Sequence, residues 1–201
     1  RIYIRSTLGD ELWIGSLAPV SDHPALFKTE VQLQFNDTAY SDNILQVTVP
    51  DKIVIRAVDK CDETGASKAL VYWVNVRAWD GELTVIPSKP YYNNGDDITI
   101  RLVDPDANRN PNQIETVQVK ITSWKLVNGE LQPVDPAGAT LTLVETGENT
   151  GVFEAPYTID TSKFPPFFSV GDTLKISYED QIASDGKTKV TSEVLLPIGY
   201  M

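Results

Sequence analysis

The segment Asp104-Pro-Asp-Ala-Asn108 places side-chain oxygens at alternate positions of one short stretch. Calcium prefers oxygen ligands, and calcium-binding loops begin with this alternate spacing. The segment does not have the glycine and the distal glutamate that an EF-hand loop requires, so it is not an EF-hand. Two interpretations stay open: a cation-binding loop, or a polar turn in which Asp and Asn side chains bond their own backbone.

Alternation of apolar and polar residues surrounds this segment, and it is the period of half-buried strands. Asn128-Gly129 adds a hairpin signal, because both residue types accept positive φ. Seven strands with frequent turns predict an immunoglobulin-like sandwich of two antiparallel sheets. The predicted strands are Glu82–Ile86, Ile98–Val103, Thr116–Leu126, Ala139–Val144, Val152–Ile159, Thr173–Tyr178 and Lys189–Leu196.

The same design occurs twice. Asp51–Asp59 aligns without a gap on Asp172–Asp180, and such a long period indicates tandem domains. We therefore expect an all-β chain of two tandem immunoglobulin-like β-sandwich domains, residues 1–80 and 81–201. The first copy matches from the third strand onward and would lack strands A and B. Its expected strands, C to G, are Ile2–Ser6, Glu11–Leu17 (C′), Glu30–Phe35, Ile44–Val49, Lys52–Val58 and Ala69–Ala78.

An incomplete sandwich exposes a sheet edge and part of its core, which promotes aggregation. Two explanations for the missing strands A and B stay open. Either they precede Arg1 and were removed by cleavage or excision, or another chain supplies them by strand addition. The second explanation predicts a filament or lattice subunit.

In such a sandwich the B–C, D–E and F–G loops share one end, where the domain joint would also lie. Carboxylates gathered there repel one another unless a cation binds. The sequence therefore suggests a Ca²⁺ site that locks the joint. Its candidate ligands are Asp80, Glu82, Asp104, Asp106, Asn108, Asp180 and Asp185.

Composition narrows the function. The net charge of −11 argues against nucleic acid or anionic membrane as a partner. With one cysteine, Cys61, and one histidine, His23, the chain has no internal disulfide and no Cys/His pair for catalysis. We expect Cys61 to be an exposed thiol in a polar turn and His23 to lie in a loop. No catalytic triad or phosphate-loop pattern is present, so we expect a non-catalytic chain, and no apolar run is long enough for a membrane helix.

The aromatic residues are candidates for core packing or for binding surfaces. We expect Trp73 and Trp124, which lie in alternating strands, to be core residues, and one ring of Tyr91-Tyr92 to close the bottom of the second domain. A sugar-binding platform would need the rings on one face, which the sequence alone does not establish. The run containing Phe164, Phe167 and Phe168 is either a contact patch between subunits or a loop folded over the core.

Three spaced motifs of the second domain resemble archaeal surface-layer immunoglobulin-like repeats. The opening is Tyr92-Asn-Asn-Gly-Asp-Asp-Ile-Thr-Ile100 followed by Val103-Asp-Pro-Asp-Ala-Asn108 and Ile114-Glu-Thr-Val117. The D–E hairpin is Leu143-Val-Glu-Thr-Gly-Glu-Asn-Thr-Gly-Val-Phe153, and the F strand is Val170-Gly-Asp-Thr-Leu-Lys-Ile-Ser-Tyr-Glu-Asp180. The first domain departs from this pattern, because Asn36-Asp-Thr-Ala-Tyr-Ser-Asp42 stands in place of the D–E turn.

The resemblance implies a secreted, often glycosylated structural protein that assembles with copies or other subunits of a cell-surface lattice, frequently with divalent cations. It would be extracellular, and the Asn36-Asp-Thr38 sequon would then be a glycosylation site. An adhesin stalk or binding module that recognises glycans or a partner protein is the alternative. A weaker alternative is the accessory region of a secreted hydrolase.

Overall fold

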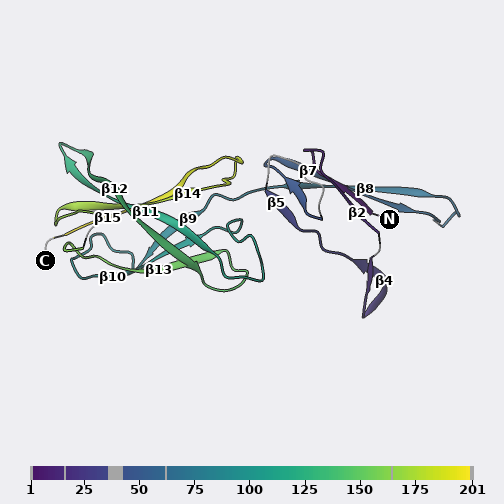
Figure 1. The fold of residues 1–201 in the computed structure, drawn as a ribbon, viewed down its shortest axis with the longest axis horizontal. Coiled ribbons are helices and arrows are strands. Elements are labelled where there is room, and N and C mark those ends of the chain that lie inside the picture. Colours follow the sequence, from purple (N-terminus) through teal and green to yellow (C-terminus); the bar gives the residue numbers. More distant parts are fainter. Residues whose placement is uncertain (1, 16, 36–42, 62, 164, 200–201) are drawn as a thin grey trace. The chain divides into compact units, whose positions relative to one another are not determined.

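A computed structural model describes residues 2–15, 17–35, 43–61, 63–163 and 165–199. The protein is all-β, and no described residue is helical (Figure 1). No helix with the length and hydropathy needed to cross a membrane occurs in these ranges. The chain divides into two compact units, unit 1 (Arg1–Ala78) and unit 2 (Trp79–Met201).

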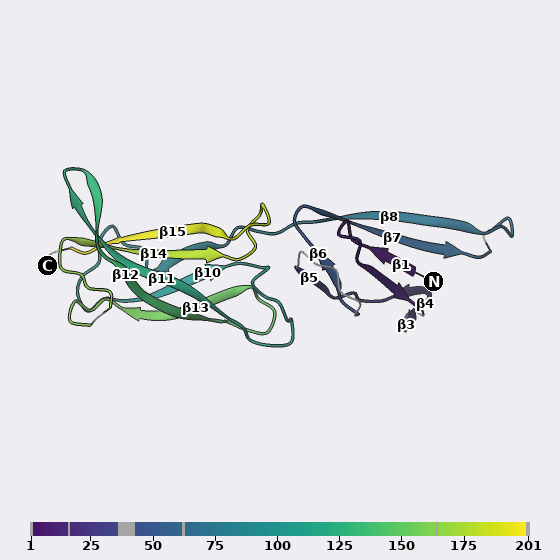
Figure 2. The ribbon, with the colours of Figure 1, turned by 45° about the horizontal axis from the view of Figure 1, so that its top comes forward.

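Unit 2 is a sandwich-like arrangement, but it is built from one seven-stranded antiparallel sheet that curls on itself and not from the two separate sheets that the sequence predicts. Its strand order is β15-β14-β11-β12-β13-β10-β9. Figure 2 shows β14 and β15 on one side of the unit and β13 on the other. The strands are β9 (Glu82–Ile86), β10 (Asp97–Val103), β11 (Thr116–Val127), β12 (Glu130–Glu145), β13 (Val152–Thr158), β14 (Asp172–Asp180) and β15 (Lys189–Pro197).

The two ends of this sheet approach each other. The β9 backbone N–H of Leu83 donates to the Ser192 hydroxyl of β15 at 2.9 Å, and the Thr191 hydroxyl donates to the Gly81 carbonyl at 3.1 Å. Alternate residues of every strand therefore face a common interior. Phe153, Ile100, Leu143, Leu174 and Leu196 are wholly buried there.

The hairpin between β11 and β12 turns where the sequence predicts it, with Asn128 at φ 53° and Gly129 at φ 87°. The strand after the turn is longer than expected, since β12 begins at Glu130 and not at Ala139. The extension was not predicted because it contains Pro133 and Pro136, and proline is normally unfavourable within a strand. Proline is tolerated there because β12 pairs with β13 only at Val144 and Glu145, which leaves its first half as a sheet edge.

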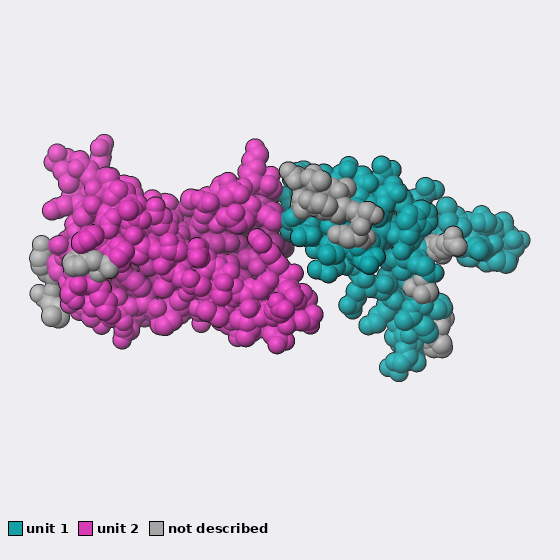
Figure 3. Space-filling view, viewed as in Figure 1, with its two compact units in different colours: residues 1–78 teal, residues 79–201 magenta. Residues whose placement is uncertain are grey.

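Unit 1 contains a four-stranded antiparallel sheet of order β2-β1-β7-β8 and two smaller pairs, β3–β4 and β5–β6. Figure 3 shows the ends of the β7–β8 and β3–β4 hairpins projecting from the body of the unit. The strands are β1 (Ile2–Arg5), β2 (Glu11–Ile14), β3 (Ala18–Val20), β4 (His23–Lys28), β5 (Leu33–Phe35), β6 (Leu45–Val47), β7 (Asp51–Asp59) and β8 (Lys68–Val76).

Unit 1 departs from the expected sandwich in two places. The β5 and β6 strands pair in parallel, with Leu33 opposite Leu45, whereas adjacent D and E strands of an immunoglobulin fold are antiparallel. The β3–β4 hairpin was not predicted, and His23 begins a strand instead of lying in a loop. The pairing of Val20 with His23 forms this hairpin despite Pro24.

The core of unit 1 covers only part of its main sheet. Leu45, Val47 and partly buried Phe35 pack on Ile4 and Ile53. On the same face, Leu70, Tyr72 and Val74 of β8 stay 37%, 61% and 45% exposed, because no described strand lies over them. We call these three residues the uncovered core face.

Three aromatic predictions have different outcomes. Trp73 is not a core residue, because it projects from the opposite face of β8 and is 64% exposed, and Trp124 is only half-buried beneath the Lys175 ammonium. Alternation indicates which residues share a face but not whether another layer covers that face. Tyr92 is buried while Tyr91 is exposed, which confirms that one ring of the pair closes the domain.

Candidate functional site

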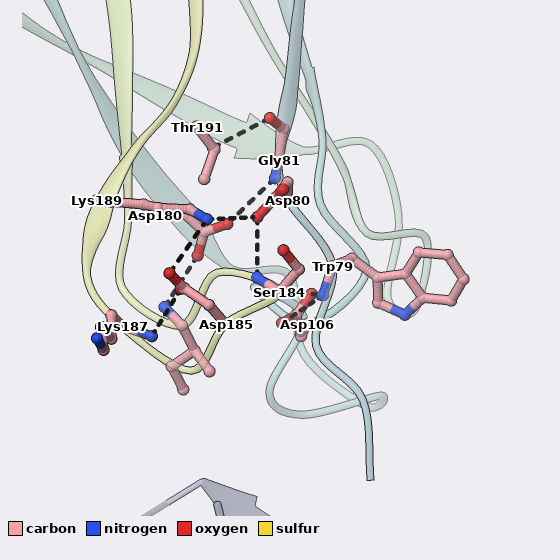
Figure 4. Close-up of polar contacts among 11 residues, drawn as sticks. Trp79, Asp80, Gly81, Asp106, Asp180, Ser184, Asp185, Lys187, Lys189 and Thr191 are labelled. Carbon is pink, nitrogen blue, oxygen red and sulfur yellow. Dashed lines mark hydrogen bonds and ion pairs between the residues drawn. The ribbon is translucent and has the colours of Figure 1, made fainter. Parts of the chain in front are cut away.

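A group of acidic residues of unit 2 lies where β9 begins and where the loops after β10 and β14 meet it (Figure 4). Asp180, at the end of β14, accepts hydrogen bonds from the backbone N–H groups of Gly81 (3.1 Å) and Ile182 (2.9 Å). Asp80 accepts from the N–H of Ser184 at 2.9 Å and lies 3.6 Å from the Lys189 ammonium. These carboxylates fasten the first residues of the unit to the β14–β15 loop.

Asp104 occupies the centre of this end and is only 1% exposed. Its Oδ2 accepts a hydrogen bond from the Tyr178 hydroxyl at 2.8 Å, and its Oδ1 accepts from the Ala107 N–H at 3.3 Å. Burial, then the hydrogen bond to Asp104 and its negative charge, raise the pKa of Tyr178. The phenol therefore stays protonated and serves as a permanent donor to the carboxylate.

Asp106 forms a carboxyl pair with Asp104. Burial, hydrogen bonding to Asp104 and the charge of Asp104 raise the pKa of Asp106 to about 7, while the Trp79 N–H, 3.2 Å from Oδ1, opposes the shift. A second ionised carboxylate beside Asp104 would be repelled, so the protonated form of Asp106 is favoured. Burial and the nearby charges of Asp104 and Asp80 also raise the pKa of Asp180.

Glu145 organises the turn between β12 and β13. It is 3% exposed, its Oε1 accepts from the N–H groups of Thr150 (2.8 Å) and Gly151 (2.9 Å), and its Oε2 accepts from that of Glu115 (3.3 Å). Burial alone would raise the pKa of Glu145, but these backbone donors lower it below its ordinary value. The side chain thus satisfies amides that the turn leaves without strand partners.

The predicted calcium ligands are brought together only in part. Asp104, Asp106 and Asp180 line one depression, Asp80 lies beside Asp180, and Asp185 joins them through its 3.5 Å ion pair with Lys189. Glu82 is exposed on β9, and Asn108 donates its side-chain amide to Asn149 at 2.8 Å. Among the described residues, no three carboxylate, histidine or cysteine groups are arranged to hold a metal ion. The carboxylate oxygens of Asp80 and Asp180 accept hydrogen bonds from backbone N–H groups instead of facing a common metal position. Calcium binding therefore stays a prediction of the sequence.

The remaining predicted positions lie elsewhere. Phe168 is buried in the core, as a loop folded over the core requires, while Phe167 is 55% exposed, and a contact between subunits through this run stays a prediction. Asn36 and Phe164 lie outside the described residues. Cys61 is an exposed thiol, as expected.

The sequence analysis did not predict that Tyr178 would contact the acidic residues, although the alternation of β14 indicates that its side chain faces inward. A depression of about 600 Å³ opens at this end, and Asp104, Asp106, Tyr178 and Asp180 contribute to its lining.

No protein-family model matches the sequence, and no curated protein matches it either. The resemblance to surface-layer repeats therefore rests on the three quoted motifs.

The raised pKa of Asp106 predicts a pH dependence for the stability of unit 2. A folded-state pKa raised from 3.8 to about 7 favours the neutral form, so the stabilisation from Asp106 is present at acidic pH and is lost as the pH rises through about 7. Asp106→Asn, which stays uncharged, should raise the melting temperature of unit 2 by a few degrees near pH 8 and leave it unchanged near pH 4. Differential scanning calorimetry measures both values.

Asp185→Asn is the matched control, because Asp185 is an exposed aspartate at the same end and pairs with Lys189. It should not reproduce the gain near pH 8. An equal gain from both variants would show that general acidity, and not the carboxyl pair, limits stability.

Proposed function

We propose that this chain is a structural, non-catalytic component of a cell-surface layer, and that it assembles when a strand from another subunit covers unit 1. The observation that carries this proposal is the uncovered core face on β8. Apolar residues of an edge strand that point toward a core and yet stay exposed mark a position for strand addition.

Unit 2 supports this proposal by providing the complete version of the same arrangement. Leu174 pairs with Leu196, and both are wholly buried. The corresponding pair in unit 1 is Ile53 with Val74, and Val74 is 45% exposed. In unit 2 the residues of β9 and β10 belong to the same core cluster as those of β14 and β15, whereas no described segment of unit 1 forms such a layer over Leu70, Tyr72 and Val74 of β8.

The open edge of β8 also offers backbone N–H and C=O groups that can pair with an added strand. It stands at the end of the order β2-β1-β7-β8, so one edge of its backbone pairs with β7 and no described strand pairs with the other. An added strand would gain ladder hydrogen bonds there, and its inward-facing side chains would lie beside Leu70, Tyr72 and Val74 and reduce their exposure. A subunit that accepts a strand in this way is suited to a lattice or filament, where each contact repeats.

The acidic end of unit 2 is consistent with a structural role. Its aspartates and Glu145 accept hydrogen bonds from backbone amides, which fix the loops in place. Their repeated use as backbone acceptors favours mechanical stability of the module, as the surface-layer resemblance implies.

Val74→Asp tests the proposal. We expect the wild-type chain to associate with rising concentration and Val74→Asp to stay monomeric, because a charge on the uncovered core face cannot be buried without a partner. Sedimentation velocity gives the size distribution, and electron microscopy shows arrays or filaments.

Asn75→Asp is the matched control, since Asn75 is exposed and follows Val74 on the opposite face of β8. It should associate as the wild type does. Circular dichroism of both variants checks that the fold is kept. A monomeric wild type, or a Val74→Asp chain that still associates, would contradict assembly through this face.

A further inference from the structure

The outer face of the four-stranded sheet in unit 1, opposite the uncovered core face, carries exposed aromatic rings. Tyr3 lies opposite Trp13 on β2 and opposite Arg56 on β7, so the three side chains share one face. Arg5 lies opposite Val54, which in turn pairs with Trp73. The strand pairing therefore aligns Trp13, Tyr3 and Trp73 on one face, and we call this surface the aromatic face.

Tyr3 and Trp13 form a corner at one side of this face. Their ring centroids are 4.7 Å apart and the ring planes meet at 51°, while Trp13 remains 67% exposed. The Tyr3 hydroxyl donates to Glu11 Oε1 at 2.5 Å, and Arg5 Nε lies 3.6 Å from the same oxygen. The corner opens into a depression of about 470 Å³, lined by Tyr3, Glu11, Trp13, Arg56, Val58 and Lys60.

A second depression, of about 410 Å³, lies at the other side of the sheet and is lined by Lys52, Trp73 and Asn75. Trp13 and Trp73 are on β2 and β8, three inter-strand spacings apart, which corresponds to about 14 Å across the sheet. Each depression combines an exposed indole with groups that form hydrogen bonds. A ligand that fills both is a short chain of rings and not a single small molecule.

Comparison with unit 2 shows that the fold does not require these aromatic residues. Arg56 corresponds to Ser177 in the internal alignment, and the strand partners of Ser177 are Lys120 and Glu193. Where unit 1 has Trp13 and Tyr3, unit 2 has Thr140 and Lys120. Unit 2 keeps the sandwich-like fold with an ordinary charged surface here, including the 2.9 Å Lys175–Glu193 ion pair. The rings of unit 1 are therefore available for binding.

The aromatic face is basic although the chain is acidic. Its charged side chains in the described strands and depressions are Arg5, Lys52, Arg56 and Lys60 against Glu11, whereas the whole chain carries −11. Charges more than about 8 Å away are largely screened at physiological ionic strength, so the local excess decides which ligand is attracted. The excess favours an anionic ligand.

We propose that the aromatic face binds an anionic glycan, whose sugar rings lie on Trp13 and Trp73 and whose acidic groups pair with Arg56 and Lys52. The apolar face of a sugar ring packs on an indole, and its hydroxyls donate to an acceptor such as Glu11. A protein partner fits less well, because lysine and glutamate are depleted at protein interfaces, whereas Lys52, Lys60 and Glu11 line the depressions beside the rings. Stacked nucleobases fit less well because Tyr3 and Trp13 meet at an angle and present no flat platform.

The test uses the full chain and a short oligogalacturonate, with its methyl ester as the uncharged counterpart, in isothermal titration calorimetry. The acidic form should bind, more weakly at high salt, and the ester should bind less tightly. Trp13→Ala should weaken binding of the acidic form by about five- to tenfold. Arg56→Ser, which installs the residue found in unit 2, should reduce the preference for the acidic form over the ester.

Trp79→Ala is the matched control, because Trp79 is a 60% exposed indole in unit 2 whose backbone, not its ring, bonds Asp106. It should bind oligogalacturonate as the wild type does. Unchanged binding in Trp13→Ala, equal losses in both Trp variants, or no binding of the acidic form would overturn the proposal. So would tighter binding of a single-stranded oligothymidylate, or self-association of the chain that Trp13→Ala abolishes, since these assign the face to nucleic acid or to a second copy.

Discussion

Glu145→Ala should lower the free energy of unfolding of unit 2 by about 3 kcal/mol. The substitution removes the acceptor for three backbone N–H groups, those of Thr150, Gly151 and Glu115, at a position that is 3% exposed. The loss leaves the buried Gly151 N–H without an acceptor and weakens the two part-buried donors, and each unsatisfied buried amide is costly. Native-state hydrogen exchange of the buried β11 amides measures this loss in the intact chain.

Glu148→Ala is the control, because Glu148 lies in the same turn but is exposed. Its effect should stay within about 0.5 kcal/mol. The cost of Glu145→Ala should also shrink in acid. The pKa of Glu145 is lowered in the folded state, so its contribution is present above the ordinary carboxyl pKa and disappears as the pH falls through the lowered value. Equal losses from both glutamates would refute the structural role of Glu145.

Gly81→Ala should cost about 2–3 kcal/mol, because a methyl group has no room at the start of β9. A Cβ there would lie 2.5 Å from Tyr178 Cε1 and 3.1 Å from Asp104 Oδ2. The buried ring cannot move away without breaking its 2.8 Å bond to Asp104. The same hydrogen-exchange measurement reports this change in the free energy of unfolding.

A double-mutant cycle separates this clash from a general cost of replacing glycine. In a Tyr178→Leu background the ring and its hydroxyl are gone, so Gly81→Ala should cost markedly less than in the wild type. Additive losses would mean that the alanine is resisted by something other than Tyr178.

Most of unit 2 could be predicted from the sequence because its strands obey one simple period. The alternation from Asp172 to Asp180 is repeated in the burial of every second residue, and the Asn128-Gly129 turn has the positive φ angles that its residue types favour. The extension of β12 could not be predicted, since prolines normally exclude a strand and only the pairing pattern shows which half of β12 is an edge.

Burial in unit 1 was harder to predict from the sequence, because the short strands β5 and β6 cover only part of the main sheet. Alternation in β8 identified a strand, yet the exposure of both Trp73 and Val74 depends on what lies above each face. The parallel pairing of β5 with β6 is a long-range choice that neither three-residue strand encodes locally.

The sequence predicted where the acidic residues of unit 2 meet, but it did not predict which groups their carboxylates bind. Loop topology predicted that Asp104 and Asp180 would approach one another. Their use as acceptors for backbone amides and for Tyr178 depends on loop conformations that carboxylate spacing does not reveal.

Neighbouring residues of β8 serve opposite surfaces, since Trp73 belongs to the aromatic face and Val74 to the uncovered core face. A shift of one residue in the pairing of β8 with β7 would exchange the two sets, presenting indole to the incoming strand and valine to the ligand. The two surfaces can therefore be altered separately by substitution, whereas a register shift disables both together.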